Sequence, residues 1–287
     1  MRRNINGPWR PRAERRRGAD GEFELNRLAV LGQPIAHSRS PAMQNAAFAA
    51  LGMAAEWRYE AIEVGPDRFE EVVRSLADGG YVGANVTVPH KSAAIAVSDE
   101  LSEVAREIGA ANTLAFEQGE VRAYNSDADG FLRALPEPPG GARALVLGAG
   151  GAARAVVWSL VREGAEVEVW NRTELRSRNL CAELGGSPVE APDAGSCGLI
   201  VNATAVGLGG EDPFGVLPLR AEQLGPGQTV VDLVYGASPT RLAEAAAAEG
   251  AAVVDGIEVL ARQGAISFQI WTGREPPLDA MREAARD

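Results

Sequence analysis

The chain of 287 residues is 46% hydrophobic and 23% charged, a balance that is typical of a folded globular protein and excludes a mainly disordered one. It has no apolar run long enough to cross a membrane, and its two cysteines exclude a disulfide scaffold and favour a cytoplasmic location. A net charge of −11 argues against a nucleic-acid partner, and two histidines are too few for a histidine-built zinc site, so we expect no metal.

The N-terminal segment differs in charge from the rest of the chain. Residues 1–17 hold seven arginines and one acidic residue, Glu14. Because arginine-rich segments of this kind are usually disordered tails, we expect residues 1–24 to form a basic disordered extension. A mitochondrial targeting helix is the alternative, but Pro8 and Pro11 argue against an amphipathic helix there.

From residue 25 on, strand-like and helix-like segments alternate, which predicts an α/β architecture. The spacing of apolar residues predicts strands at 28–32, 56–62 and 81–88, and helices at 40–52, 66–78 and roughly 98–108. A strand pair that turns at Gly119 is predicted at 110–116 and 120–124.

Four polar clusters lie where these strands are predicted to end, at residues 37–41, 85–91, 111–113 and 125–127. Ligand sites in open α/β sheets lie beyond the carboxyl ends of strands, so we expect the clusters to converge on a small polyhydroxylated anion. Ser38 and Ser40 stand two apart in a loop and can both donate to a carboxylate. The alternative for Ser40 is a helix N-cap, with Pro41 as the first helical residue.

Lys91 is the single lysine among 28 basic residues. Because lysine can release its proton in proteins and arginine cannot, this exception indicates proton transfer, with chance survival of a surface lysine as the alternative. An extended segment puts residues 85, 87, 89 and 91 on one side and His90 on the other, so we prefer Lys91 to His90 as the acid. The same alternation groups Asn125, Asp127 and Asp129 without choosing between the two aspartates.

A linker rich in proline and glycine is predicted at 136–141, and a second α/β unit follows it. Its predicted strands are 143–147, 166–170, 199–203, 229–234 and 251–254, and its predicted helices are 152–163 and 239–249. A last helix is predicted at 257–271 and is expected to return to the first domain.

A glycine-rich turn, Gly148-Ala149-Gly150-Gly151-Ala152-Ala153, follows a strand and opens a helix. This G-x-G-x-x-A pattern indicates dinucleotide binding, because glycines let the backbone approach a pyrophosphate and the helix N-terminus offers free N–H groups. A tight strand–helix turn without a ligand is the alternative.

The residues after the next strand indicate which cofactor is bound. An NAD site has an acidic residue there to hold the ribose hydroxyls, whereas this chain has Asn171-Arg172-Thr173 and then Arg176. Arginine and threonine donate to a 2′-phosphate, so the pattern favours NADP. The alternative is a solvated helix start, since Arg178 is also nearby.

Nine stretches together have the order of a known family: GQPIAHSRSP (32–41), NVTVPHK (85–91), GAANTL (109–114), NSDADG (125–130), GAGGAARA (148–155), NRT (171–173), NATAVG (202–207), DLVY (232–235) and DGIEVLARQGAISFQIWTG (255–273). Through them the chain resembles the shikimate dehydrogenase family over about residues 28–273. It departs from the family pattern at Gln44, where His is frequent, and at Ser126, where Thr is frequent.

The resemblance implies roles for individual residues. The family's catalytic pair falls on Lys91 and Asp127. Its substrate contacts fall on Ser38, Ser40, Thr87, Asn112, Tyr235 and Gln263. Its cofactor contacts fall on Gly148, Ala149, Gly150, Gly151, Ala152, Asn171, Arg172, Thr173, Arg176 and Gly256.

The resemblance also implies a fold and an activity. We expect an α/β substrate domain (25–126 plus 257–287), a Rossmann-like NADP-binding domain (127–256) and a cleft between them. The implied reaction is NADP-dependent, reversible reduction of 3-dehydroshikimate to shikimate, in aromatic amino-acid (chorismate) biosynthesis. The alternatives are a quinate/shikimate dehydrogenase with broader substrate or NAD use, and a non-catalytic NADP-binding regulator. The expected partner is the small-molecule substrate, without nucleic acid or membrane, and the expected state is a monomer or homodimer.

Overall fold

The computed structural model describes residues 3–4, 25–236 and 238–287. Its contacts divide the chain into two compact units, one made of the residues up to Ser126 and from Ala261 on, the other of Asp127–Leu260. The extension predicted for residues 1–24 lies outside the described residues, apart from the two-residue strand β1 (Arg3–Asn4). None of the helices in the described part of the chain has the length and apolar character needed to cross a bilayer.

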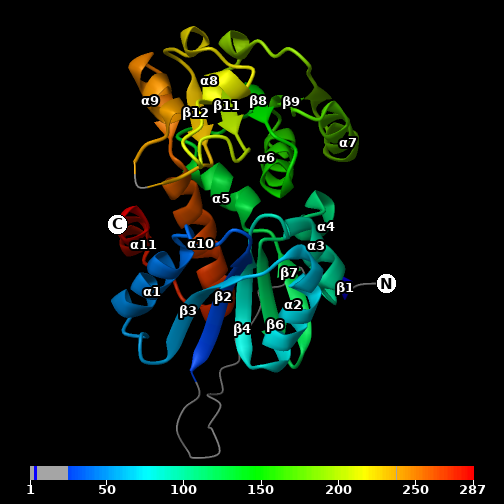
Figure 1. Ribbon diagram of the computed structural model, residues 1–287, viewed down its shortest axis with the longest axis vertical. Coiled ribbons are helices and arrows are strands. Elements are labelled where there is room, and N and C mark those ends of the chain that lie inside the picture. The colour runs from blue at the N-terminus through cyan, green and yellow to red at the C-terminus, as the bar shows by residue number, and fades with distance from the viewer. Residues whose placement is uncertain (1–2, 5–24, 237) are drawn as a thin grey trace, which may run out of the picture. The chain divides into compact units, whose positions relative to one another are not determined.

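The first unit is built on a mixed sheet, which within the described residues has the strand order β1-β5-β7-β6-β4-β2-β3 (Figure 1). The remaining strands of this sheet are β2 (Asn26–Gly32), β3 (Trp57–Glu63), β4 (Tyr81–Val86), β5 (Glu100–Leu101), β6 (Thr113–Glu117) and β7 (Glu120–Tyr124). Strand β2 runs parallel to both β3 and β4, whereas β6 runs antiparallel to β4 and to β7. The carboxyl ends of β2 and β4 therefore lie at the same edge of the sheet.

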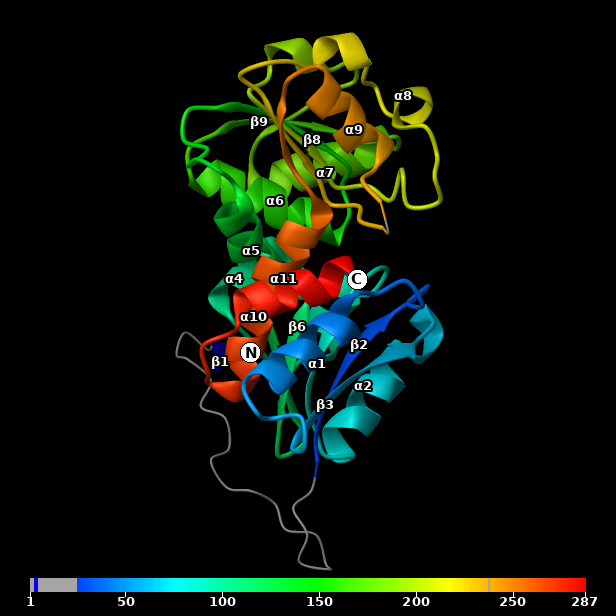
Figure 2. The same ribbon diagram turned by 90° about the vertical axis from the view of Figure 1, so that its left-hand side faces the viewer.

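Helices pack on this sheet because each buries an apolar stripe. The helices of the first unit are α1 (Ser40–Ala50), the short η1 (Pro66–Arg68), α2 (Phe69–Asp78), α3 (Lys91–Val97), α4 (Glu103–Ile108), the C-terminal part of α10 (Gly256–Thr272) and α11 (Leu278–Arg286). Helix α11 lies along α1, as Figure 2 shows. Trp271 of α10 is fully buried and donates from Nε1 to the Leu114 carbonyl at 2.9 Å. A Cβ at Gly83 would lie 2.3 Å from that Nε1, so only glycine leaves room for the indole at this position.

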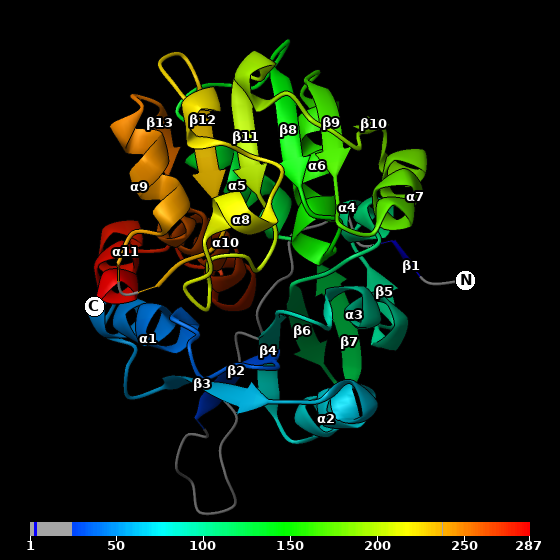
Figure 3. The same ribbon diagram turned by 45° about the horizontal axis from the view of Figure 1, so that its top comes forward.

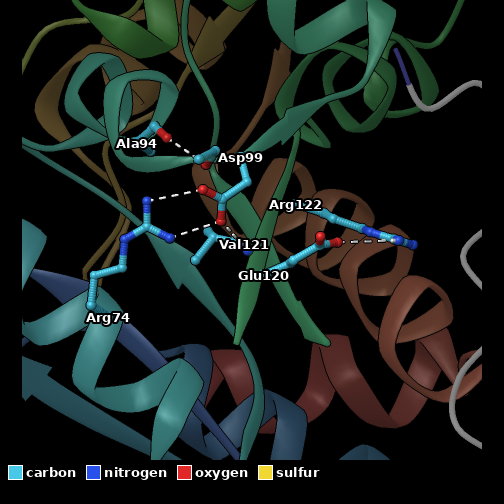
Figure 4. A network of polar contacts seen from close by, with 7 residues as sticks. Arg74, Ala94, Asp99, Glu120, Val121 and Arg122 are labelled. Atoms are coloured by element: carbon cyan, nitrogen blue, oxygen red, sulfur yellow. Dashed lines mark hydrogen bonds and ion pairs between the residues drawn. The ribbon is translucent and has the colours of Figure 1, made fainter. Parts of the chain in front are cut away.

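The helix predicted at 98–108 is wrong in its first half. Asp99 lies extended along β7, where its N–H donates to Val121 O and its carboxylate accepts from Val121 N, both at 2.8 Å. Arg74 of α2 holds the same carboxylate through two hydrogen bonds of 2.7 and 3.1 Å (Figure 4). The helix begins only after Ser102, whose hydroxyl caps it by accepting from Ala105 N at 3.2 Å.

The second unit is built on a parallel sheet, with strand order β10-β9-β8-β11-β12-β13 in the described part of the chain (Figure 3). The strands are β8 (Arg143–Leu147), β9 (Glu166–Trp170), β10 (Ser187–Pro188), β11 (Leu199–Asn202), β12 (Thr229–Asp232) and β13 (Ala252–Val254). Numbered along the chain this order is 3-2-1-4-5-6, the arrangement of dinucleotide-binding folds. In such folds the ligand lies beyond the carboxyl ends of the strands, where the order reverses; here that point is between β8 and β11.

Helices cover both faces of the second sheet, so alternate residues of β8 enter different cores. Ala144 and Val146 pack with the face that α6 covers, whereas Leu145 and Leu147 pack with the face that α9 covers. A strand buried on both faces is a continuous apolar run, which explains why β8 can be predicted from its sequence. The helices of this unit are α5 (Asp127–Ala134), α6 (Gly151–Arg162), α7 (Glu174–Leu184), α8 (Pro213–Val216), α9 (Arg241–Ala248), the short η2 (Ala194–Ser196) and η3 (Ala221–Gln223), and the first residues of α10.

Candidate functional site

Two loops of the first unit meet where β2 and β4 end. Gln33 N donates to Val88 O at 3.0 Å, and Thr87 N donates to Leu31 O at 2.9 Å. A Cβ at Gly32 would lie only 2.4 Å from the Thr87 methyl carbon, so glycine permits this close approach. The loop that carries Ser38 and Ser40 and the loop that carries Thr87 therefore start side by side.

The alternative of Ser40 as a helix N-cap is wrong. Ser40 is the first residue of α1, and Arg39 occupies the cap position without a side-chain cap hydrogen bond. The Ser40 N–H points back to the Ser38 hydroxyl at 3.3 Å. The two serines are thus joined at the entry to α1, and Ser40 is 5% exposed.

Lys91 begins a helix, so the prediction of an extended segment through residues 85–91 is wrong. Strand β4 ends at Val86, the Val88–Pro89 peptide bond is cis, and α3 starts at Lys91. The half-buried Lys91 is anchored through its backbone, since its carbonyl accepts from Ala111 N at 2.8 Å. That bond places the start of α3 beside the segment that carries Asn112.

His90 is held inside the first unit. It is 1% exposed, its Nε2 lies 2.6 Å from the Val64 carbonyl oxygen, and its ring stacks on Phe69 with 4.4 Å between centroids. A carbonyl oxygen only accepts, so this nitrogen carries the hydrogen of the bond. A ring fixed in this way supports the start of α3 and is not placed to deliver protons to a ligand.

We expect His90→Gln to retain substantial turnover. The amide can still donate to Val64 O, while the stack on Phe69 is lost, so stability should fall more than activity. The expected decrease in kcat is far smaller than the about 10²- to 10⁴-fold that a general acid contributes. Steady-state kinetics and thermal unfolding of the same preparation measure both quantities. A folded variant with kcat reduced to that extent would make His90 the acid.

Asn112 and Gln263 come together across 151 residues of sequence. Asn112, just before β6, donates from Nδ2 to Gln263 Oε1 of α10 at 3.0 Å, and both side chains are buried. Ser126 completes the group, because its N–H donates to Asn112 Oδ1 at 2.7 Å. The predicted substrate contacts of the first unit thus include a hydrogen-bonded pair of amides.

Asp127 and Asp129 do not share a side, because α5 begins at Asp127 and the shared-side prediction required a strand. Residues two apart in a helix point in different directions. Asp129 pairs with Arg133 one turn later at 2.7 Å, and both side chains are 56% exposed. Asp127 is half-buried. An exposed ion pair accounts for Asp129, which leaves Asp127 as the candidate.

In the second unit, the glycine-rich turn has the shape that a pyrophosphate site requires. Gly148 has φ +117°, and a Cβ there would lie 2.9 Å from Ala203 O, so only glycine fits. A Cβ at Gly150 would meet nothing within 4 Å, which leaves room for a ligand to approach the backbone. The N-cap residue of α6 is Gly150, which has no side chain to bond to the first N–H groups of this helix, so these groups are suited to an anionic ligand.

Arg172 and Arg176 are exposed after β9, and within the described residues neither forms an ion pair with a carboxylate. Their neighbour Arg178 is engaged by Glu174, one helical turn away, and lies 3.6 Å from Glu190. The Asn171 side chain donates to Thr173 O at 2.9 Å and so fixes the turn that begins α7. Two arginines at this turn can bind a dianionic phosphate.

Asp232 is a functional candidate that sequence reasoning missed. It is 1% exposed and accepts from Asn202 Nδ2 at 2.9 Å, Val234 N at 3.1 Å and Thr240 Oγ1 at 2.5 Å. These bonds join the ends of β11 and β12 to the N-cap of α9 and hold the loop of the half-buried Tyr235. Burial raises the pKa of the Asp232 carboxyl, against the three hydrogen bonds, which lower it. The sequence signal that could have identified it is that two apolar strands, β11 and β12, each end in a polar residue.

The loop after Asp232 borders a cavity of about 140 Å³, whose lining residues are 207, 208, 210, 211, 234–236 and 238–241. Tyr235 is one of its lining residues. Gly256, at the start of α10, lies against the same segment, because a Cβ there would be 2.7 Å from Val234 O. Gly256 therefore sets how closely α10 approaches the end of β12.

We expect Asp232→Ala to lower the free energy of unfolding by about 2 to 4 kcal/mol, because three donors, two of them buried, lose their acceptor. Asp232→Asn keeps one acceptor oxygen and should lose less. A raised pKa means that the folded state holds the proton more tightly than the unfolded state. The wild type should therefore lose stability as pH rises from the ordinary aspartate pKa to the folded one, while the Asn variant lacks this loss. Urea unfolding of both proteins across acidic pH tests this; parallel pH curves would contradict it.

Within the described residues no group of three His, Cys, Asp or Glu side chains is placed to hold a metal ion. Cys181 and Cys197 are both buried free thiols. Burial raises the pKa of each thiol, so neither is activated as a nucleophile.

Comparison with known proteins gives matches along nearly the whole chain. Residues 30–114 match the shikimate dehydrogenase substrate binding domain, 137–203 the shikimate / quinate 5-dehydrogenase model, and 256–286 the shikimate 5'-dehydrogenase C-terminal domain. Shikimate dehydrogenase (NADP(+)) of Methanopyrus kandleri is 43% identical over 92% of this chain and 96% of its own length.

Solved structures with a bound nicotinamide cofactor are similar to this one. Shikimate 5-dehydrogenase from Thermus thermophilus, in complex with NADP(H) and shikimate, has a TM-score of 0.84 and 43% identity, covering 91% of this chain and 99% of that one. Quinate dehydrogenase from Corynebacterium glutamicum, in complex with NAD, has a TM-score of 0.80 and 28% identity, covering 91% and 98%.

Proposed function

This chain belongs to the shikimate/quinate 5-dehydrogenase family, and we propose that it is an NADP-dependent shikimate dehydrogenase. It would catalyse reversible reduction of 3-dehydroshikimate to shikimate in aromatic amino-acid biosynthesis. The observation that carries the proposal is 43% identity to an NADP-dependent shikimate dehydrogenase over 92% of the chain. The glycine turn and the two arginines after β9 support the choice of cofactor.

NADP fits the residues of the second unit. The turn from Gly148 to Ala152 would hold the pyrophosphate through backbone N–H groups at the start of α6. Arg172 and Arg176, with Asn171 and Thr173 shaping the turn, would hold the 2′-phosphate, and Gly256 would complete the cofactor site. When bound, the reduced nicotinamide supplies the hydride.

Reduction of a ketone needs one hydride and one proton. We assign the proton to Lys91, whose ammonium at the carbonyl oxygen would also stabilise the developing negative charge. We assign to Asp127 the orientation of Lys91 and a hydrogen bond to a substrate hydroxyl. In the reverse direction the same lysine, as the neutral amine, would accept the proton of the hydroxyl.

The polar groups of the first unit suit a substrate that carries one carboxylate and several hydroxyls. Ser38 and Ser40 would donate to the carboxylate. Thr87, Asn112 and Gln263 would bind hydroxyls, with Tyr235 as a further substrate contact. We further propose a cytoplasmic location, consistent with two free thiols, and a monomer or homodimer.

Quinate is the alternative substrate, which the likeness to a quinate dehydrogenase favours. The test is to measure kcat/KM for shikimate and for quinate, with NADP and with NAD, from the absorbance of the reduced nicotinamide. We expect the shikimate–NADP combination to be the most efficient. A higher value for quinate with NAD would overturn the assignment, and NADPH binding without turnover of either substrate would indicate a non-catalytic protein.

A further inference from the structure

Beneath the Asn112–Gln263 amide pair lies a triangle of buried hydroxyl groups, from Thr113, Ser126 and Ser267. The three oxygens lie 2.8 to 3.2 Å from one another, and all three residues are 0% exposed. They come from β6, from the residue before α5 and from α10. Polar groups buried this deeply are costly unless their hydrogen bonds are complete. Each hydroxyl of the triangle must therefore be matched to donors and acceptors around it.

Backbone groups fix the direction of the hydrogen bonds around the triangle. The Ser126 N–H can only donate, so the Asn112 atom 2.7 Å from it is the oxygen Oδ1. The other end of this amide is therefore Nδ2, which donates to Ser126 Oγ at 2.9 Å and to Gln263 at 3.0 Å. Because Nδ2 can only donate, the Gln263 atom facing it must be the oxygen Oε1.

The lower side of the triangle is fixed in the same manner. The Asn112 carbonyl can only accept, so the Asn85 atom 2.9 Å from it is Nδ2, which also lies within 3.2 Å of Thr113 Oγ1 and Ser267 Oγ. Asn85 Oδ1 in turn accepts from the Tyr59 hydroxyl at 2.7 Å. The Ser267 hydroxyl donates to the Gln263 backbone carbonyl at 3.2 Å. These bonds together hold the Asn112–Gln263 amide pair in one orientation.

We propose that Ser126 is a positioning residue, whose buried hydroxyl helps to hold the Gln263 amide oxygen inward so that Gln263 presents N–H groups to the substrate. This rests on the proposed function, in which Gln263 binds a substrate hydroxyl. The Ser126 hydroxyl faces two amide oxygens, Asn112 Oδ1 at 3.2 Å and Gln263 Oε1 at 3.4 Å, so Gln263 Oε1 faces two donor groups, Asn112 Nδ2 and the Ser126 hydroxyl. Gln263 then acts as a donor to an oxygen of the substrate. Ser126 acts on Gln263 both directly and through Asn112 Nδ2, which donates to both side chains.

The test is a double-mutant cycle on kcat/KM for shikimate. Removing the hydroxyl in Ser126→Ala should raise KM for shikimate about 10-fold while kcat and the KM for NADP change little. Ser126→Thr keeps a hydroxyl and should restore KM. In a Gln263→Ala background, Ser126→Ala should have almost no further effect, because the residue through which it acts has been removed.

The matched control is Ser98→Ala in the same unit. Ser98 is also buried, at 3% exposure, and its hydroxyl donates to Ala94 O at 2.6 Å, away from the amide pair. Ser98→Ala should lower the melting temperature without changing the KM for shikimate. Should Ser126→Ala fail to fold, Thr113→Val removes another corner of the triangle and carries the same expectations.

Three results would overturn the proposal, and they are distinguishable. If the wild type turns over shikimate but the effects of Ser126→Ala and Gln263→Ala multiply, Ser126 does not act through Gln263. Equal KM values for Ser126→Ala and the wild type would exclude the positioning role as well. If the wild type turns over neither shikimate nor quinate, the proposed function itself fails and the positioning role fails with it.

Discussion

Lys91→Arg should lower kcat for shikimate oxidation by about 10²- to 10⁴-fold, with a smaller change in KM. Arginine keeps the positive charge, so binding and charge stabilisation at the oxygen are partly retained. It does not release its proton at any ordinary pH, so it can neither protonate an alkoxide nor accept a proton from a hydroxyl. The substitution therefore separates the contribution of the positive charge to kcat from the contribution of proton transfer.

The matched control is Arg68→Lys, the reverse exchange in the same unit. Arg68 forms an exposed ion pair with Glu71 at 2.9 Å, and its substitution should leave kcat unchanged. Lys91→Met, which removes charge and proton together, should be at least as slow as Lys91→Arg. If Lys91→Arg turned over shikimate at nearly the wild-type rate, the proton would have to come from another group.

The fold could be predicted where the determinants are local. Strand β8 is an apolar run between a linker and a glycine turn, and that turn has a spacing that few other structures require. The start of α3 could not be predicted in this way, because its sequence, KSAAIAV, is short and has only two buried residues. The strand β5 was missed because its extended shape comes from pairing with β7 and from Arg74 holding Asp99, which are contacts between distant residues.

In the candidate site too, features set by the local sequence could be predicted, and contacts between distant residues could not. Lys91 is conspicuous in the sequence because it is the only lysine, and Arg172 and Arg176 could be predicted from their place after a strand. Alternation along a strand was the wrong geometry for Asp127, since the helix begins at that residue. The contact of Ser126 with Gln263 could not be predicted, because the two residues are 137 apart in the sequence and only the fold brings them together.

Replacing Arg172 and Arg176 together by serine should lower kcat/KM for NADP by about 10²- to 10⁴-fold, since each charge-assisted hydrogen bond contributes about 1.5 to 3 kcal/mol. The value for NAD should change little, because NAD has no 2′-phosphate for these side chains to bind. Both cofactors would be compared at saturating shikimate and fixed ionic strength, since the electrostatic part of binding depends on salt.

Arg178→Ser is the matched control for this experiment. Arg178 lies on α7, as Arg176 does, and has the same charge, but Glu174 and Glu190 already engage it. Its loss should therefore leave the preference for NADP nearly intact. A fall in kcat/KM for NADP as large as that of the double variant would mean that the general positive potential of α7 attracts the cofactor. An equal loss for NADP and NAD in the double variant would place these arginines away from the 2′-phosphate, because only contacts to that group distinguish the two cofactors.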